Sequence, residues 1–319
     1  MNYSQIKGFN YQPSWGCSGV ELWRKFDPDL MRVELGRGKK FFPKMNAIRL
    51  WLSYDAFIYS GQTGRARFCS NFEAALTIAH TCGLRVMPVL FNRWHDAVLD
   101  YGGIYVDHFV PKLGWVGQKF AENNAAYLEA VVKPHADDER IFAWDLCNEP
   151  FSYSRPASEI PEIEAAEYDW LKSVHDACKG HGAVAPITIG NHMGVPPERV
   201  DAITDLVSIH PYWFPDSDKA AFEKHLDDAV ESAQKSNKPI LATETCWGSH
   251  NDAVRVEIIR YTLGQLKKRN LGWLVYLLHH SLIADAHRPE FGPVGWPENL
   301  AFIEADGSLR PGHDIFNEF

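Results

Sequence analysis

The chain has 319 residues, of which 45% are hydrophobic and 23% are charged, a balance typical of a globular protein with a large core. It contains 32 Lys and Arg against 41 Asp and Glu, which gives a formal net charge of −9. This excess of negative charge disfavours binding to nucleic acid or to anionic lipid.

Eight short runs of apolar and β-branched residues recur along the chain and predict strands. Between them, apolar residues return about once per helical turn, as Phe68, Phe72 and Leu76 do, which predicts helices that cover a parallel sheet. We therefore expect the α/β class and a (β/α)8 TIM barrel, with a single domain over residues 1–319. The predicted strands are 8–11, 46–52, 85–90, 141–146, 187–190, 206–210, 240–244 and 272–278.

The chain carries no signal for export or for a membrane anchor. Its first residues have no positively charged stretch followed by an apolar run, and no segment has 18 consecutive apolar residues. Six cysteines are scattered without C-x-x-C spacing, which argues against a zinc knuckle or a compact disulfide framework. We expect reduced thiols, a cytoplasmic location and no membrane partner; the oligomeric state is left open.

Two glutamates follow apolar strands. Glu149 stands three residues past the end of the fourth predicted strand and precedes Pro150, and Glu244 ends the seventh. In a barrel all parallel strands end on one face, so these carboxylates are expected to share one cavity. Cleavage of a glycosidic bond needs such a pair, one carboxyl protonated and the other ionised, and a separation of about 5–5.5 Å gives retention of configuration.

Other polar residues are predicted beside the glutamates. Arg49 lies within the apolar second strand and needs an acidic partner there, for which Glu244 is the candidate. His210 ends the sixth predicted strand and Tyr212 comes two residues later, so both are expected to point to the same side of an extended segment. A guanidinium and a phenol near Glu244 would favour its ionised form, which suits a nucleophile.

Four motifs thus occur in chain order: Arg49, Asn148-Glu149-Pro150, His210-x-Tyr212 and Glu244. This series resembles clan A glycoside hydrolases, the group of cellulases, mannanases and β-galactosidases, over nearly the whole chain. The resemblance implies that Glu149 is the acid/base, Glu244 the nucleophile and Asn148 a partner of the sugar 2-hydroxyl. It also implies that Arg49 and Tyr212 orient the nucleophile, and that His210 lines the cleft near the acid/base.

The sequence departs from that group at two strand ends. Many members have a Trp at the end of strand eight as a platform for the sugar, and here Tyr276 or a histidine such as His279 stands there instead. After strand three many members have a His, for which Asn92, Trp94 and His95 are rival candidates.

Two long connections follow the third and eighth strands, 92–116 and 279–296, and both are rich in aromatic residues. The first is expected to form an ordered wall that turns the site into a pocket. Several tryptophans near strand ends either contact the sugar or serve for packing: Trp15, Trp94, Trp213, Trp247 and Trp296.

Metal-dependent barrel hydrolases generally have His-x-His at the end of the first strand, and this chain has no histidine there. We therefore expect no metal and no cofactor. The expected function is retaining hydrolysis of a glycoside, β-linked and short because a cytoplasmic location excludes intact polymers. A transglycosylase with the same carboxylates and a non-catalytic sugar-binding barrel are the alternatives, and the sugar, the linkage and the mode of attack stay open.

Overall fold

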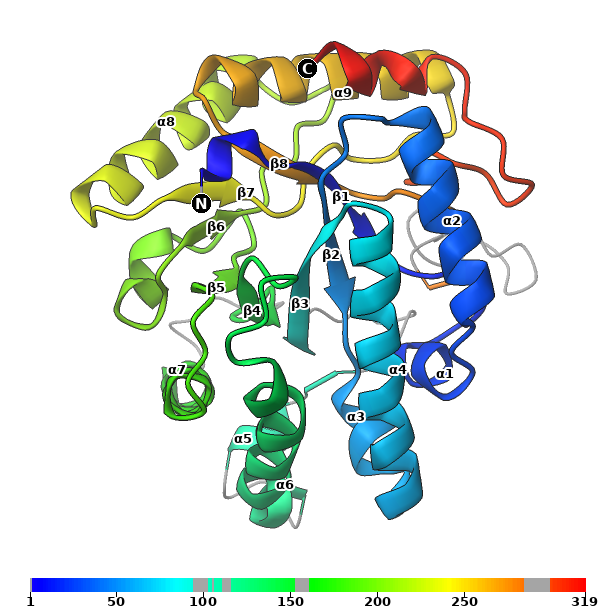
Figure 1. Cartoon of the computed structure of the whole chain (residues 1–319). Coiled ribbons are helices and arrows are strands. Elements are labelled where there is room, and N and C mark those ends of the chain that lie inside the picture. Colours follow the sequence, from blue (N-terminus) through cyan, green and yellow to red (C-terminus); the bar gives the residue numbers. More distant parts are fainter. Residues whose placement is uncertain (1, 94–102, 105, 111–115, 153–160, 284–298) are drawn as a thin grey trace.

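The structure is a computed structural model, which describes residues 2–93, 103–104, 106–110, 116–152, 161–283 and 299–319. Eight parallel strands form one sheet in the order β5-β4-β3-β2-β1-β8-β7-β6. Figure 1 shows this sheet at the centre and helices around it. The strands are β1 (Lys7–Tyr11), β2 (Ala47–Trp51), β3 (Arg85–Asn92), β4 (Trp144–Asn148), β5 (Ile187–Gly190), β6 (Val207–Ile209), β7 (Ile240–Ala242) and β8 (Gly272–Val275).

The two outer strands of this order, β5 and β6, meet through hydrogen bonds at their first residues. The amides of Asp205 and Leu206 donate to the carbonyl oxygen of Ile187 at 2.7 and 3.3 Å. The hydroxyl of Thr188 donates to the carbonyl oxygen of Leu206 at 2.6 Å. These contacts bring the sheet to near closure, and the (β/α)8 barrel predicted from the sequence is confirmed.

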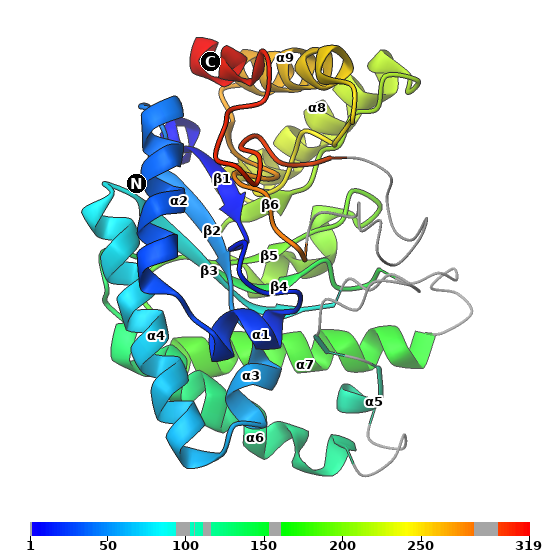
Figure 2. The ribbon, with the colours of Figure 1, turned by 90° about the vertical axis from the view of Figure 1, so that its right-hand side faces the viewer.

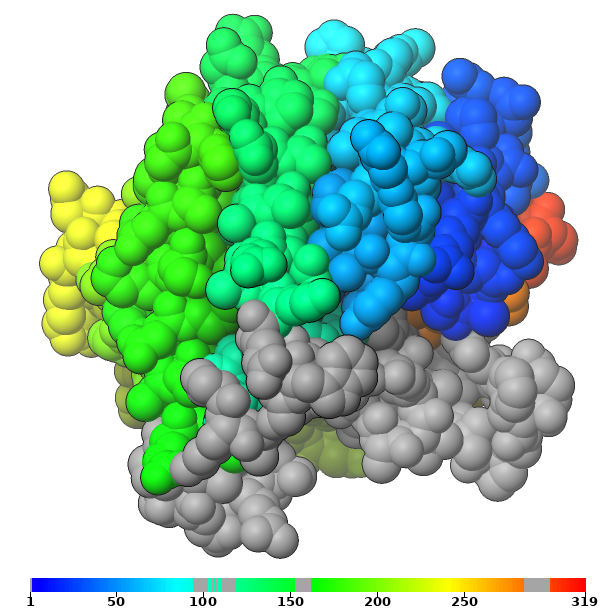
Figure 3. Space-filling model, turned by 90° about the horizontal axis from the view of Figure 1, so that it is seen from below, coloured from blue at the N-terminus to red at the C-terminus, as the bar shows by residue number. Residues whose placement is uncertain are grey.

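The outer layer is helical, and its segments follow one another in chain order around the barrel, as the run of colours in Figure 3 shows. Figure 2 shows α2 and α4 standing on one side of the strands and α8 and α9 lying across another. No helix in the described part of the chain is long and apolar enough to cross a bilayer. The helices are α1 (Gly19–Arg24), α2 (Pro28–Phe41), α3 (Tyr54–Ile58), α4 (Gly61–Thr81), α5 (Val106–Phe109), α6 (Val116–Val131), α7 (Pro161–Gly180), α8 (Lys219–Lys235) and α9 (Asp252–Lys268), with 3-10 turns at Tyr3–Gln5, Lys133–His135, Pro197–Ile203 and His313–Glu318.

Several helices begin where the sequence provides a side-chain cap. Asp27 accepts hydrogen bonds from the amides of Asp29 and Leu30 at the start of α2. Asp218 caps α8 and Asn251 caps α9 in the same way. These caps satisfy amide donors that the helix itself leaves unpaired, so they fix where each helix leaves its preceding loop.

The barrel interior is apolar at one end and polar at the other. A buried cluster that includes Ala47, Met87, Leu241 and Leu274 fills the half from which the strands begin. The polar residues predicted from the strand ends occupy the opposite half. A barrel of eight strands is a packed core and not a pore, so this apolar plug leaves the carboxyl ends of the strands as the place for a site.

Of the eight strands only β5 has its predicted bounds, and the others differ by one to three residues at one or both ends. β4 begins at Trp144 rather than at 141, and Ile141 makes only an isolated bridge to Val86. β7 and β8 end earlier than predicted, at Ala242 and Val275. After β8 the apolar run continues because Leu277 and Leu278 are buried, Leu277 against Leu300. An apolar run alone therefore does not mark where a ladder of hydrogen bonds ends.

Candidate active site

Arg49 on β2 is the centre of the polar half of the barrel. It is fully buried, and its Nη1 donates to Oε1 of Glu244 in a short contact and to Oδ1 of Asn10 at 2.9 Å. Its Nη2 donates to Oδ1 of Asn148 at 2.8 Å, and its Nε donates to Oδ2 of Asp145 at 2.9 Å. The structure therefore brings Arg49 to Glu244, as the sequence predicted, and adds a second carboxylate that the sequence analysis missed.

Glu244 follows β7 by two residues and is 5% exposed. Besides Arg49, its carboxylate accepts a hydrogen bond from the hydroxyl of Tyr212 at 2.7 Å. Burial, together with Glu244, raises the pKa of Tyr212 well above its usual value, so this phenol stays protonated and donates. A cation and a hydrogen-bond donor thus hold the two oxygens of one carboxylate and fix its orientation.

Glu149 directly follows β4 and is 6% exposed. Its Oε1 lies 2.8 Å from Nδ1 of His210, and Nε2 of the same ring lies 3.0 Å from the hydroxyl oxygen of Thr243. Burial raises the pKa of Glu149 to about 7, against the opposing effects of His192 and Arg49. Burial also lowers the pKa of His210 to about 3, so the imidazole next to Glu149 is neutral at ordinary pH.

The two glutamates are close enough to act on one bond. One carboxylate oxygen of each, together with a nitrogen of His210, lies within 4.8 Å of the others. This spacing fits the roughly 5–5.5 Å at which a carboxylate can attack an anomeric carbon directly, and is shorter than the gap that an intervening water requires. The arrangement can therefore place a proton-bearing Glu149 and the oriented side chain of Glu244 on either side of one sugar carbon.

Asp145 and Asn10 are functional candidates that the sequence analysis did not find. Both are fully buried, on β4 and β1, and both bind Arg49. Oδ1 of Asp145 also accepts the amide of Gly190 at 3.0 Å, and burial raises the pKa of this carboxyl despite the attraction of Arg49. An aspartate inside a predicted strand was a signal for a buried ion pair, just as Arg49 was.

A register shift in β4 explains how Asp145 and Asn148 come to bind the same guanidinium. Residues three apart face opposite sides of a regular strand. β4 has one more residue than β5 between the pairs Asp145–Thr188 and Asn148–Gly190. Such a bulge re-aims the side chains that follow it, and both residues reach Arg49 in consequence.

Gly190 at the end of β5 is required by the close approach of this network. A Cβ atom at this position would lie 2.7 Å from Nη2 of Arg49 and 3.0 Å from both Oδ2 of Asp145 and Nε2 of His210. Its carbonyl oxygen accepts the amide of Glu149 at 2.8 Å. The glycine therefore leaves room for these three polar side chains, and its carbonyl oxygen holds the backbone of Glu149 in place.

Asn148 and Asn92 extend the site toward β3. Nδ2 of Asn148 donates to Oδ1 of Asn92 at 3.0 Å, and Asn92 is the last residue of β3. Of the three rival candidates after this strand, Asn92 is thus the one that the structure places beside the site. The other two, Trp94 and His95, lie outside the described residues, as do Trp296 and most of the long segment expected to wall the pocket.

An aromatic wall lies on the side of β7 and β8. The ring of Trp247 meets that of Tyr212 edge to face, with centroids 5.2 Å apart, and it packs in one cluster with Tyr276. Arg255 on α9 ties this wall together, since it donates to the carbonyl oxygens of Cys246 and Trp247 and, at 2.8 Å, to that of Tyr276. Burial lowers the pKa of Arg255 to about 10, so it remains a cation at neutral pH.

Two of the predicted sugar contacts are elsewhere in the fold. His279 is 1% exposed and lies 3.1 Å from Nη1 of Arg37 on α2, because the chain turns away from the barrel axis once β8 has ended at Val275. Trp213 is also 1% exposed and packs against Tyr261 of α9, with ring centroids 4.5 Å apart. Trp213 thus packs in the apolar core, whereas His279 lies among polar groups that include Arg37, and Tyr276 is the strand-eight candidate that packs beside Trp247.

Among the described residues, two groups have the spacing to hold a metal ion: Glu149, His210 and Glu244, and, on the outer layer, Glu73, His135 and Asp138. In the first group both oxygens of Glu244 already accept hydrogen bonds. In the second, Arg140 pairs with both carboxylates. Each group thus has a protein cation beside its carboxylates, which opposes the binding of a metal ion.

No family model matches the chain. A curated relative, the probable mannan endo-1,4-beta-mannosidase A of Aspergillus flavus, is 26% identical over 203 residues, which cover 62% of this chain and 45% of the relative. The chain thus spans less than half the length of this relative. The similarity agrees with the resemblance to clan A glycoside hydrolases.

Solved structures share the fold across 98% of the chain. A GH5_18 protein from Streptomyces cattleya in complex with GlcNAc superposes with a TM-score of 0.74 at 17% identity, over 79% of its own length. The exo-beta-1,4-mannosidase from Opitutaceae bacterium strain TAV5 superposes with a TM-score of 0.73 at 20% identity, over 58% of its length. A variant of the Streptomyces cattleya protein has been solved with Manb1-4GlcNAc.

Proposed function

We propose that the protein is a retaining glycoside hydrolase that works by double displacement, with Glu244 as nucleophile and Glu149 as acid and then base. The observation that supports this most directly is the split between two carboxylates within 4.8 Å of each other. One is held by a cation and a phenol, and the pKa of the other is raised to about 7 by burial. A site that only binds sugar has no need of such a split.

In the first step the carboxylate of Glu244 attacks the anomeric carbon and forms a glycosyl ester as the bond to the leaving oxygen breaks. Glu149 gives its proton to that oxygen, so the leaving group departs as a neutral alcohol. Arg49 and Tyr212 keep one orientation of the attacking carboxylate, because each holds a different oxygen.

In the second step Glu149, now ionised, takes a proton from a water molecule, whose oxygen attacks the anomeric carbon and releases Glu244. Each step inverts the configuration at the anomeric carbon, so the two steps together restore the original configuration. A transglycosylase would use the same two steps with a sugar hydroxyl in place of water, and the acceptor side of the site decides between the two outcomes.

We further propose β-linked mannosides as substrates, and short ones, in keeping with the cytoplasmic location expected from the sequence. The names of the similar proteins support the choice of sugar, since the curated relative is a mannan endo-1,4-beta-mannosidase and a solved neighbour is an exo-beta-1,4-mannosidase. Comparing aryl mannosides, mannobiose and mannan as substrates would determine the linkage that is cleaved and the length of the preferred saccharide.

The test is a panel of nitrophenyl β-mannoside, β-glucoside, β-galactoside and α-mannoside, followed by proton NMR of the first sugar released from the best substrate. We expect the β-mannoside to react fastest and the first product to be the β anomer, before mutarotation. An α anomer from a β substrate would make Glu244 a base and contradict its role as nucleophile. If no glycoside is cleaved, the whole proposal fails.

A further inference from the structure

The imidazole of His210 has a second hydrogen-bond partner behind the site. Its Nδ1 lies 2.8 Å from Oε1 of Glu149, and its Nε2 lies 3.0 Å from the hydroxyl oxygen of Thr243, which directly follows β7. That hydroxyl also makes a short contact with the hydroxyl of Ser208 on β6. Ser208, Thr243 and His210 thus form a hydrogen-bonded series that ends on Glu149, and the two hydroxyls have no part in the reaction proposed above.

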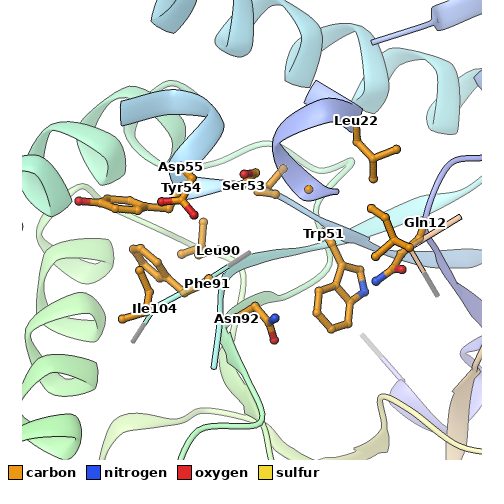
Figure 4. A pocket seen from close by; sticks show the side chains of 14 residues that line it. Gln12, Leu22, Trp51, Ser53, Tyr54, Asp55, Leu90, Phe91, Asn92 and Ile104 are labelled. Atoms are coloured by element: carbon orange, nitrogen blue, oxygen red, sulfur yellow. The ribbon is translucent and has the colours of Figure 1, made fainter. Parts of the chain in front are cut away.

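The protein encloses this series. The side chains of Thr243 and His210 are fully buried, and Ser208 is 1% exposed. Figure 4 shows the small cavity next to the site, with Trp51 and Asn92 among the side chains that line it. None of the described residues that line this cavity belongs to the series. The hydrogens of the two hydroxyls and of the ring are therefore shared among the members of the series and Glu149.

The direction of these hydrogen bonds follows from the number of hydrogens. Burial lowers the pKa of His210 to about 3, so the ring is neutral at ordinary pH and has a single N–H. Among the described residues Thr243 is the only hydrogen-bond partner of the Ser208 hydroxyl, so Ser208 donates to Thr243. Thr243 then has its own hydrogen left for Nε2 of the ring. Nε2 therefore accepts, and the ring proton lies on Nδ1, which donates to Glu149.

We propose that Thr243 and Ser208 are positioning residues, which fix the ring proton of His210 on Nδ1 and thereby direct the acid proton of Glu149 to the substrate. This inference rests on the proposed function. With an N–H at Nδ1, the acid proton cannot lie between Oε1 of Glu149 and the ring, so it is available to the leaving oxygen. The opposite tautomer would accept the acid proton at Nδ1 and hold it away from the substrate.

The same tautomer serves the second step. Once Glu149 has given up its proton, the N–H at Nδ1 donates to a carboxylate, and a hydrogen bond to the charged form stabilises that form. The ring therefore keeps its tautomer through both steps, and no proton has to move along the two hydroxyls.

Other charged or titratable groups also surround Glu149 and His210: Arg49 on β2, Asp145 on β4, His192 after β5, Tyr212 after β6 and Glu244 after β7. The nearest of them to Nδ1 of the ring is Oε2 of Glu244, at 3.6 Å. Within the described part of the chain only Thr243 makes a hydrogen bond to Nε2. Removal of its hydroxyl therefore changes the partner of the ring without removing a charge.

The first test is nitrogen NMR of the protein with isotopically labelled histidine rings, in which protonated and unprotonated ring nitrogens give separate signals. The signals of His210 are assigned by their loss in His210→Gln. We expect the wild type to keep the proton on Nδ1 at pH 6 and at pH 8, on both sides of the pKa of Glu149 at about 7. In Thr243→Val, which keeps the shape without the hydroxyl, we expect both tautomers at pH 6. A proton on Nε2 in the wild type, or an unchanged tautomer in Thr243→Val, overturns the inference.

The second test compares kcat/KM on a glycoside with a poor leaving group and on the dinitrophenyl glycoside of the same sugar. Thr243→Val should lose about tenfold on the first and little on the second, because only the first needs the proton of Glu149. Its basic limb should move to higher pH, since the ionised form of Glu149 loses a fixed donor. Ser208→Ala should act in the same direction by a smaller factor, and Thr243→Ser, which keeps the hydroxyl, should behave as the wild type does.

Thr188→Val is the matched control, because Thr188 is also fully buried and its hydroxyl donates to the carbonyl oxygen of Leu206. It should change neither kcat/KM value nor the position of the basic limb. Thr243 directly precedes Glu244, and a disturbed nucleophile would lower kcat/KM on both substrates alike. Equal losses on the two substrates in Thr243→Val therefore overturn the inference. A wild type that cleaves no glycoside contradicts the proposed function, whereas the NMR signals still decide where the proton of His210 lies.

Discussion

Glu149 and Glu244 stand at the same end of the barrel with nearly the same exposure, 6% and 5%, yet their neighbours differ in charge. Glu244 accepts from the cation of Arg49 and from the phenol of Tyr212. Glu149 meets the neutral imidazole of His210, and no cation of the described residues lies at hydrogen-bond distance from it. Burial is thus common to both carboxyls, but Glu149 has no bonded cation to offset the rise that burial causes in its pKa.

The largest expected effect separates the two roles. Glu244→Ala should lower kcat/KM on every substrate by a factor on the order of 10⁶, because no first step remains. Glu149→Ala should lower it by about 10²–10⁴ on glycosides with poor leaving groups and hardly at all on dinitrophenyl glycosides, which need no proton. Steady-state kinetics with a series of aryl leaving groups measures both.

Added azide provides a second test of the roles of Glu149 and Glu244. In Glu149→Ala it should attack the glycosyl ester and yield an azide of retained configuration. In Glu244→Ala it should replace the missing carboxylate and yield the inverted azide. If the two variants give the same anomer, the assignment of roles is wrong.

A smaller effect is expected at Asp145, which binds Nε of Arg49, whereas Glu244 binds Nη1. Asp145→Asn keeps the shape but leaves the buried guanidinium with one carboxylate, which should lower the free energy of unfolding by about 3 kcal/mol. We expect kcat/KM to fall on the order of tenfold to a hundredfold, because Arg49 is no longer held in place. Chemical denaturation and kinetics on one preparation measure both.

Asp29→Asn is the matched control, since Asp29 pairs with Arg32 on the surface of α2 with side-chain exposures of 91% and 58%. Its free energy of unfolding should change by less than about 1 kcal/mol. An Asp145→Asn variant as stable as this control would mean that Arg49 does not depend on the second carboxylate.

The pH dependence should follow the proton on Glu149. Because its pKa is raised to about 7, kcat/KM on a poor leaving group should fall as the pH rises through about 7. The basic limb should vanish with a dinitrophenyl glycoside, whose first step needs no acid. A basic limb of equal position and depth for both substrates would assign it to another group. The measured values belong to the coupled pair.

The smallest effect concerns stability. The pKa of Glu149 in the folded protein is about 7, above its ordinary value of 4.5, so the wild type gains stability below pH 4.5 and loses this gain as the pH rises through 7. Compared with Glu149→Gln, the wild type should therefore lose up to about 3 kcal/mol between pH 4.5 and pH 7, and little more above it. Denaturant melts of both proteins at pH 4, 6 and 8 measure the difference. A constant difference would show that Glu149 is solvated.

The sequence predicted the barrel and both glutamates because these depend on local patterns. Glu149 and Glu244 follow apolar runs, and eight such runs alternate with helical periods. It did not predict that Asp145 and Asn148 bind one guanidinium, because that depends on one extra residue in β4, and a bulge leaves no mark in an apolar run. His279 was misplaced since β8 ends four residues before it, where the apolar run continues.

Gly190 has a consequence for how this chain tolerates mutation. Other strands bind Arg49 through side chains, whereas β5 makes room for it because Gly190 has no side chain. By residue type Gly190→Ala is a mild exchange, but here a single methyl group would press on a guanidinium, a carboxylate and an imidazole at once. In a library selected for activity, position 190 should therefore admit fewer amino acids than its buried neighbour Ile189, whose side chain packs in the apolar core. In a map of tolerated substitutions, Gly190 would therefore stand out as a constrained position of the site, although it has no functional group of its own.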